Sequence, residues 1–271
     1  MTASGKVVLV SGGTFGIGRA ITLGLAGRGH SVVAFGLEAP QVSSIAQSAI
    51  PSLRAELSQR GLAAELMEAD VSKSGDVAKV VDLALAKFGR IDAVVNNAAI
   101  GPLGTVLDTD EALFDHIMAV NLKGPYLTSR AVIPHMIAQG GGSIVNIGSG
   151  AGWGKPNMAV YSASKGGLFA LSAATAYDFL HDRIRVNTVI PGGGGIVSGM
   201  SLGRVGGDAS RFGKGAPGTA AGRAATGDDV ANVVAFLLSP EAETLSGTVI
   251  DVGCFAHQGG PVPSKPAPGA S

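Results

Sequence analysis

The 271-residue chain contains 46% hydrophobic and 15% charged residues, a composition typical of a well-buried globular protein and not of a disordered one. Its formal net charge of zero gives no reason to expect nucleic acid or an anionic membrane as the main partner. No apolar run approaches the roughly 18 residues that would predict a membrane span. The single cysteine, Cys254, excludes an intrachain disulfide.

The start of the chain lacks the charged-then-apolar layout of a signal peptide, because residues 1–6 lead directly into an apolar run. We therefore expect a cytoplasmic protein. Glycine is unusually frequent, with 42 residues, and residues 203–222 combine many glycines with no clear periodicity. We expect a mobile loop there, and a flexible Gly- and Pro-rich tail over residues 259–271.

Short apolar runs alternate with longer segments of helical pattern along the chain. The runs predict strands at residues 7–11, 31–36, 64–70, 91–96, 143–147, 185–190 and 248–252. The segments between them predict helices at residues 17–29, 40–60, 75–88, 110–138, 161–182 and 228–238. Such alternation predicts an α/β fold with a parallel sheet covered by helices on both faces. No linker interrupts it, so we expect one domain over residues 1–258.

The first predicted strand leads into a glycine-rich loop and then a helix. Gly12, Gly16 and Gly18 have the spacing G-x-x-x-G-x-G. Glycines at this position let backbone N–H groups approach a pyrophosphate at the amino terminus of the helix. The loop therefore predicts a dinucleotide site, with a glycine turn that binds nothing as the alternative.

Polar residues follow the third and fourth predicted strands. Asp70 could accept a hydrogen bond from an adenine amino group, and residues 96–99 could line a ribose and stabilise the sheet, although Asp and Asn are also common turn residues. Asn121 lies inside a predicted amphipathic helix, where an amide has poor propensity. This placement indicates a specific hydrogen bond, with helix bending or capping as the alternative.

Tyr161 and Lys165 are the residues best suited to acid–base chemistry. At positions i and i+4 of a predicted helix, both side chains lie on one face. An ammonium beside a phenol favours the phenolate and lowers a pKa that is normally near 10. Ser149, twelve residues before Tyr161, follows a buried strand, where its hydroxyl can bind a substrate oxygen. The alternative is an ordinary Tyr–Lys pair on a helix surface.

In this order and spacing the motifs resemble the short-chain dehydrogenase/reductase family from residue 7 to about residue 252. The matching pieces are the glycine loop 12–18, Asp70-Val71, Asn96-Asn97-Ala98-Ala99, Asn121, Ser149, Tyr161 with Lys165, and Asn187 with Pro191-Gly192. The resemblance implies a Rossmann-like, doubly wound, seven-stranded parallel sheet with helices on both faces. It also implies a homotetramer.

The resemblance also implies a role for each catalytic residue. Tyr161 would be the general acid/base, and Ser149 would orient the carbonyl or hydroxyl. Lys165 would bind the nicotinamide ribose and lower the Tyr161 pKa, and Asn121 would hold a water of the proton relay. The implied cofactor-binding residues are Gly12, Thr14, Phe15, Gly16, Ile17, Gly18, Gly36, Leu37, Asp70, Val71, Asn97, Ala98, Ala99, Tyr161, Lys165, Pro191 and Gly192. No metal site is implied.

Three features depart from the family pattern. Ser149 is one residue nearer to Tyr161 than is usual, and Trp153 in the short loop between them is either a pocket wall or a packing anchor. Extra glycines at 193–195 follow Pro191-Gly192, so Ser198 is the nearest substitute for the usual threonine. The segment 37–69 is long, which predicts an extended second helix over residues 39–59.

We therefore expect an oxidoreductase that transfers hydride between a nicotinamide cofactor and a carbonyl or secondary alcohol. Residues 193–222 would form a substrate lid. A 3-oxoacyl thioester reductase that uses NADPH stays open, as do sugar, steroid and ring-diol substrates. From other classes, a non-catalytic nucleotide-binding regulator and a lyase or epimerase also stay open.

The end of the second strand favours NAD(H) over NADP(H). The family's usual acidic position falls on Gly36, but no Lys or Arg lies between Arg28 and Arg54 to bind a 2′-phosphate. Phe15 occupies a position where NADP enzymes often have a basic residue. Glu38 could reach the ribose 2′-hydroxyl. Ser43, Ser44 or Arg19 could instead accommodate a phosphate.

A homotetramer is further indicated by two predicted helices, 110–138 and 161–182, that are apolar on more than one side. The residues that suggest it are Ile117, Val120, Leu127, Val132, Leu168, Leu171 and Phe179. The alternative is a thick core within one chain.

Overall fold

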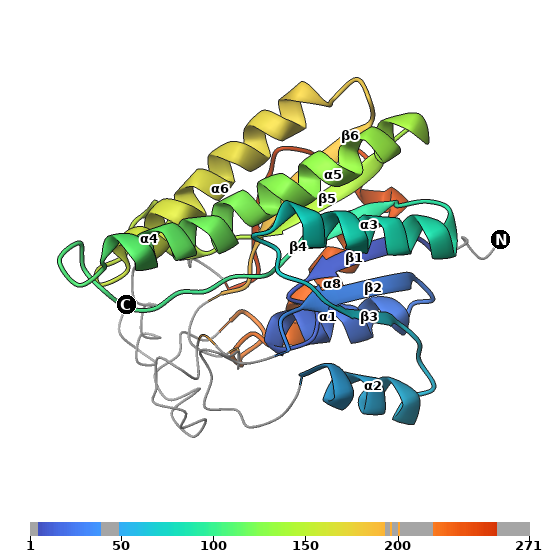
Figure 1. The fold of residues 1–271 in the computed structure, drawn as a ribbon, viewed down its shortest axis with the longest axis horizontal. Coiled ribbons are helices and arrows are strands. Elements are labelled where there is room, and N and C mark those ends of the chain that lie inside the picture. Colours follow the sequence, from blue (N-terminus) through green and yellow to red (C-terminus); the bar gives the residue numbers. More distant parts are fainter. Residues whose placement is uncertain (1–4, 39–48, 193–195, 197–199, 201–218, 254–271) are drawn as a thin grey trace, which may run out of the picture.

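The computed structural model describes residues 5–38, 49–192, 196, 200 and 219–253. It contains one seven-stranded sheet in the order β3-β2-β1-β4-β5-β6-β7, with every neighbouring pair parallel (Figure 1). The strands are β1 Val7–Ser11, β2 Ser31–Gly36, β3 Glu65–Glu68, β4 Ala93–Asn96, β5 Gly142–Ile147, β6 Ile184–Ile190 and β7 Val249–Asp251. The expected doubly wound parallel sheet is confirmed.

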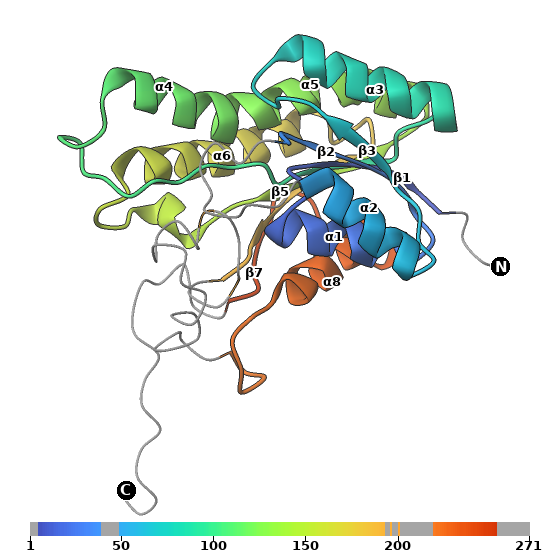
Figure 2. The ribbon, with the colours of Figure 1, turned by 60° about the horizontal axis from the view of Figure 1, so that its bottom comes forward.

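Helices cover both faces of this sheet. One layer contains α3 Ser74–Phe88, α4 Glu111–Met118, α5 Gly124–Ala138 and α6 Ala159–Asp178 (Figures 1 and 2). The opposite layer contains α1 Gly16–Ala26, α2 Ala49–Gln59 and α8 Gly227–Leu238. A capping box of Thr226 and Asp229 begins α8, as expected where a polar loop enters an apolar helix.

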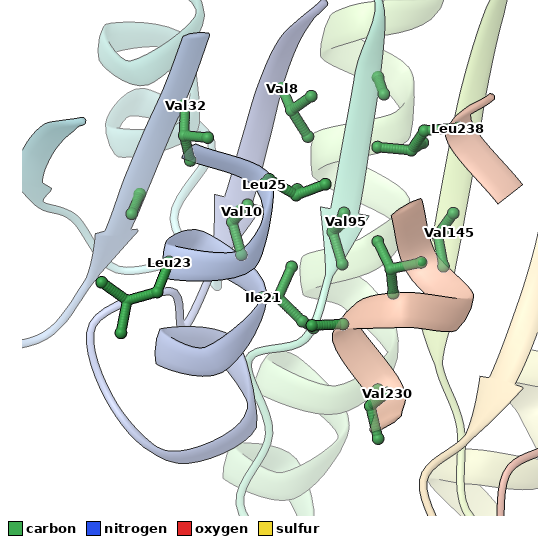
Figure 3. Close-up of a cluster of buried hydrophobic side chains, with 14 of the residues drawn as sticks. Val8, Val10, Ile21, Leu23, Leu25, Val32, Val95, Val145, Val230 and Leu238 are labelled. Carbon is green, nitrogen blue, oxygen red and sulfur yellow. The ribbon is translucent and has the colours of Figure 1, made fainter. Parts of the chain in front are cut away.

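The sheet separates two hydrophobic clusters because successive residues of a strand point to opposite faces. In β1, Val8 and Val10 join a cluster with Ile21 of α1 and Val230 of α8 (Figure 3). Val7 and Leu9 join the cluster under α3 and α5. All five residues of β1 are buried, which explains why the strand is a continuous apolar run.

The long helix expected at 110–138 is wrong in one respect, since it is interrupted. A π-helical turn, η1 Ala119–Lys123, separates α4 from α5. Asn121 lies in this turn, and its side chain bonds to the main chain of Ile100 instead of facing solvent. Pro125 follows directly at the start of α5. Single π-turns inside helices occur frequently at functional sites.

Other expected features fall partly or wholly outside the described residues. The described part of the second helix begins at Ala49, and residues 39–48 are not described. Most of the expected lid at 193–222, including Ser198, and the expected tail at 259–271 are also outside the described ranges.

The strand order reverses between β1 and β4, whose connections run to opposite faces of the sheet. In such sheets a crevice opens at the carboxyl ends of the strands, and ligands bind there. The segments singled out in the sequence follow the carboxyl ends of β1, β2, β3, β4, β5 and β6, so they share this edge.

Candidate active site

The glycine loop after β1 has the backbone conformation that its glycines permit. Gly12 and Gly16 have φ of +60° and +56°, in the left-handed region that favours glycine. A Cβ atom at Gly18 would overlap the Gly12 carbonyl, and one at Gly12 would lie 2.9 Å from Ala98 Cα. Thr14 is buried, while Phe15 and Ile17 are partly exposed beside the start of α1. The bare backbone at this helix terminus fits the pyrophosphate of a dinucleotide.

Residues after β4 hold that loop in place. Asn97 Nδ2 donates to the carbonyl oxygens of Ser11 (3.1 Å) and Gly12 (3.0 Å). The Ser11 hydroxyl oxygen accepts from the main-chain N–H of Asn97 (3.0 Å) and of Ala98 (3.1 Å). Asn97 and Ala98 thus join the β1 and β4 ends, and Ala99 continues the same segment. Ser11 was not singled out from the sequence, although its place at the end of β1 is a possible signal.

The remaining cofactor candidates line the same edge of the sheet. Gly36 ends β2, and Leu37 after it is 53% exposed. Asp70 accepts from the main-chain N–H (2.9 Å) and hydroxyl (2.7 Å) of Ser72. Burial raises the pKa of Asp70, but these bonds and the Lys73 ammonium together lower it below its usual value. Asp70 is therefore a carboxylate at neutral pH.

Two further candidate segments are fixed by close packing. Val71 is buried, and it lies against Gly124, where an added Cβ would approach Val71 Cγ1 to 3.0 Å. Pro191 and Gly192 follow β6, and Gly192 has φ of +87°. A Cβ on Gly192 would lie 2.5 Å from Gly253 Cα, so these two chain segments require glycine to pass each other.

Ser149 follows β5 and begins the short 3₁₀ turn η2 Gly150–Trp153. Its Oγ accepts from the Ala151 main-chain N–H at 3.2 Å. The Phe169 ring from α6 packs against the glycines on either side, because a Cβ on Gly148 would lie 2.8 Å from it and one on Gly152 would overlap it. Phe169 therefore sets the position of Ser149, a role that was not expected from the sequence.

Trp153 ends this turn and also contacts Phe169, with ring centroids 4.6 Å apart and planes tilted by 36°. Its side chain is 51% exposed. The contact with Phe169 therefore supports the packing-anchor interpretation of Trp153.

Tyr161 and Lys165 occupy the first part of α6, and both are buried, at 6% and 2% exposure. Lys165 Nζ donates to the main-chain carbonyl of Ile147 at the end of β5, at 2.8 Å. Burial lowers the pKa of Lys165 from 10.5 to about 8. The lysine therefore titrates close to the pH at which most enzymes act.

Asn121 is fully buried, and its side chain makes the specific hydrogen bonds that its position indicated. Oδ1 accepts from the Ile100 N–H at 2.9 Å, and Nδ2 donates to the Ile100 carbonyl at 2.8 Å. Nδ2 also donates to Ser164 Oγ at 3.0 Å. These contacts join the π-turn to Ile100, four residues after β4, and to α6.

Comparison with known proteins identifies the family. The fold and the glycine loop define a nucleotide-binding α/β protein, and residues 12–254 match the family model described as enoyl-(acyl carrier protein) reductase. The chain is 36% identical to 2-(S)-hydroxypropyl-CoM dehydrogenase 3 of Xanthobacter autotrophicus, over 94% of this chain and 96% of that protein. It is 35% identical to cyclopentanol dehydrogenase of Comamonas sp., over 93% and 98%.

Comparison with solved structures supports the same family. The 3-ketoacyl-(acyl-carrier-protein) reductase of Brucella melitensis, solved with NADH, matches with a TM-score of 0.78 and 30% identity, over 94% of this chain and 99% of that one. A putative short-chain dehydrogenase/reductase of Burkholderia xenovorans matches with a TM-score of 0.81 and 28% identity, over 95% and 98%. The chain belongs to the short-chain dehydrogenase/reductase family.

The protein is therefore an oxidoreductase that transfers hydride between a nicotinamide cofactor and a carbonyl or secondary alcohol. Within the described part of the chain, no helix is long and apolar enough to cross a membrane.

Proposed function

We propose that Tyr161 is the general acid/base of this hydride transfer, supported by Ser149, Lys165 and Asn121. The observation that carries the proposal is a buried tyrosine one helical turn before a buried lysine with a pKa of about 8, at the carboxyl edge of the sheet. A bound nicotinamide accepts or supplies the hydride. In the oxidation direction, the Tyr161 phenolate takes the proton of the substrate hydroxyl.

Lys165 and Ser149 support this proton transfer from two sides. Lys165 is held by the Ile147 carbonyl, and in its charged form it favours the phenolate of Tyr161. The Ser149 hydroxyl follows the same strand, two residues beyond Ile147, and is partly accessible. In the proposed mechanism it donates a hydrogen bond to the substrate oxygen whose charge changes during the reaction.

A substrate panel tests the activity. It contains cyclopentanol and cyclopentanone, a 2-hydroxypropyl thioether and its ketone, and a 3-oxoacyl thioester, each assayed with NAD(H) and with NADP(H). The compound with the highest kcat/KM becomes the reference substrate for all variants.

We expect Tyr161→Phe to lower kcat for the reference substrate at least 100-fold, because a general acid/base contributes about 10²–10⁴-fold. The Kd for NADH should stay within twofold of the wild-type value. Activity above about a tenth of wild type contradicts the role of Tyr161.

We also propose a preference for NAD(H). The support is that Arg19, the cation that could accommodate a 2′-phosphate, already has a carboxylate partner. Its Nε donates to Glu56 Oε2 at 2.8 Å, and its other nitrogens bond to Ser52. Glu56 also pairs with Arg60. A phosphate would have to compete with this carboxylate for its charge-assisted hydrogen bond. Ser43 and Ser44 lie outside the described residues.

Assembly as a homotetramer is part of the proposal. Of the residues that suggested it, Ile117, Val120, Val132 and Leu168 are buried within the chain itself and do not require a partner, while Leu127, Leu171 and Phe179 are only partly buried. The same layer instead exposes large side chains on its outer side. These are Phe114 of α4, Tyr126 and Ile137 of α5, Tyr177 of α6 and Leu180 just beyond it, which are between 42% and 85% exposed.

A further inference from the structure

Ser164 joins two of the proposed catalytic residues without being one of them. It precedes Lys165 in α6 and is fully buried. Its hydroxyl donates to the main-chain carbonyl of Tyr161 at 2.7 Å and accepts from Asn121 Nδ2 at 3.0 Å. One hydroxyl thus connects the π-turn η1 to the backbone of the residue that carries the phenol.

The turn that carries Tyr161 has no side-chain cap at its start. Met158, the residue before α6, makes no side-chain capping hydrogen bond, and the first turn is held there by a main-chain bond from the Ala159 N–H to the Gly104 carbonyl at 3.2 Å. Tyr161 is the third residue of the helix. Helix ends without caps fray readily, while proton transfer requires the phenol to stay within hydrogen-bond distance of the substrate oxygen.

The opposite end of the link is rigid. Asn121 is held by two hydrogen bonds to the main chain of Ile100, so its second amide hydrogen has a fixed direction. That hydrogen points at Ser164 Oγ. A serine hydroxyl that both donates and accepts can transmit this fixed position to α6.

We propose that Ser164 is a positioning residue, which anchors the first turn of α6 to η1 and so holds Tyr161 in the geometry for proton transfer. The proposal rests on the proposed role of Tyr161. Ser164 touches neither substrate nor cofactor in this role and acts through the Tyr161 backbone alone.

The same helix contains a matched control. Ser172 is also buried, donates to the Leu168 carbonyl at 2.6 Å and accepts from Asn146 Nδ2 at 2.8 Å. Like Ser164, it donates to a carbonyl of the preceding turn and accepts from a buried amide, but it lies two turns farther along α6, and neither bond goes to one of the four proposed catalytic residues. Replacing either serine by alanine removes one hydroxyl and leaves one buried amide hydrogen without its acceptor.

The test measures kcat, KM for the reference substrate, the Kd for NADH and the urea midpoint for Ser164→Ala, Ser172→Ala and Tyr161→Phe. We expect both alanine variants to lose similar stability. Only Ser164→Ala should lose kcat, by about 10-fold, since small misplacement of a reacting group is costly. Its KM and its Kd for NADH should stay within twofold of wild type. Ser164→Thr should recover most of kcat, because Thr175 of the same helix already donates to a main-chain carbonyl in this way.

The outcomes distinguish this proposal from the proposed role of Tyr161, on which it depends. If Tyr161→Phe is inactive and Ser164→Ala has the kcat of wild type, the positioning role is overturned and the role of Tyr161 stands. Equal losses of kcat in Ser164→Ala and Ser172→Ala would also overturn it, because the effect would then be general destabilisation of α6. If Tyr161→Phe keeps its activity, both proposals fail together.

Discussion

At the scale of single residues, burial of the charged Lys165 side chain lowers the stability of the folded protein. Burial lowers the pKa of Lys165 to about 8 in the folded protein, from 10.5. At pH 7 the folded state carries a buried charge that the unfolded chain carries in water. The penalty is fully present below about pH 8 and is relieved as the pH rises toward 10.5, because the unfolded chain then binds more protons than the folded one.

We therefore expect Lys165→Met to be more stable than wild type at pH 7, by up to about 3 kcal/mol, since one pKa unit corresponds to about 1.4 kcal/mol. The advantage should shrink between about pH 8 and pH 10. Urea denaturation at pH 7 and pH 10 measures it. The same variant should lose turnover. A stability difference that does not change with pH would show that burial of the ammonium is not what separates the two proteins.

Gly152 illustrates how packing fixes a reactive group. A Cβ there would overlap the Phe169 ring and lie 3.0 Å from the Lys165 main-chain carbon. We expect Gly152→Ala to displace η2 and with it Ser149, which should lower kcat at least about 10-fold and stability by about 1–3 kcal/mol. Gly75→Ala in α3 is the control, because nothing lies within 4 Å of its added Cβ. Wild-type kcat in Gly152→Ala would refute this explanation of how Ser149 is placed.

At the scale of secondary-structure elements, most of the fold was predictable because the strands are buried on both faces. The apolar runs at 7–11 and 31–36 coincide with β1 and β2, whose residues are almost all buried. The break in the helix at 110–138 was not predicted, since helical periodicity continues through residues 119–123. Asn121 of this turn is hydrogen-bonded to the main chain of Ile100, 21 residues away in sequence, a contact that no local pattern shows.

The residues of the site likewise divide into those that the sequence predicted and those that it did not. Tyr161 and Lys165 are recognisable from their spacing along one helix, and the glycine loop from its spacing between a strand and a helix. The structure has these elements at those residues. Phe169 and Ser164 were not expected, because their roles depend on contacts between α6 and two other elements, η2 and η1. A leucine at 169 would fit the same helical pattern, so periodicity alone cannot distinguish an anchor from an ordinary core residue.

The prediction on cofactor choice depends on the bond between Arg19 of α1 and Glu56 of α2. Gly36→Asp introduces a carboxylate where its Cβ has ordinary contacts, 3.4 Å from Thr14 Oγ1. We expect this carboxylate to repel the 2′-phosphate and so to lower kcat/KM with NADP more than 10-fold. The kcat/KM with NAD should stay within about threefold of the wild-type value. Glu56→Gln should act in the opposite direction and raise the NADP to NAD ratio several-fold, because Arg19 loses its partner.

The control for Glu56→Gln is Glu65→Gln, which removes an equal charge from the ion pair with Lys87. It should leave the cofactor ratio unchanged. A wild-type kcat/KM that is tenfold higher with NADP(H) than with NAD(H) would contradict the proposed preference. An unchanged ratio in Glu56→Gln would show that Arg19 does not reach the 2′ position even when it is free.

At the scale of the whole molecule, the layer of α4, α5 and α6 has a buried side and a side that still exposes aromatic and aliphatic residues. Tyr177, the second-last residue of α6, is 85% exposed, and Leu180, two residues beyond that helix, is 55% exposed. Isolated exposed apolar residues are common on protein surfaces. Several on neighbouring helices of one layer are more typical of a surface that associates with another chain. Because most soluble oligomers are homo-oligomers with closed symmetry, we expect a second copy of the chain to bind this surface.

We therefore expect wild-type protein to have the mass of a homotetramer by multi-angle light scattering at micromolar concentration. Ile137→Glu and Tyr177→Glu place a charge among these residues, so each should lower the mass toward that of a dimer or monomer. Leu107→Glu is the control, because Leu107 is 96% exposed but lies on the turn between β4 and α4. It should keep the tetramer mass. A wild-type mass equal to one chain, or dissociation by Leu107→Glu alone, would show that the α4–α5–α6 layer is not the interface.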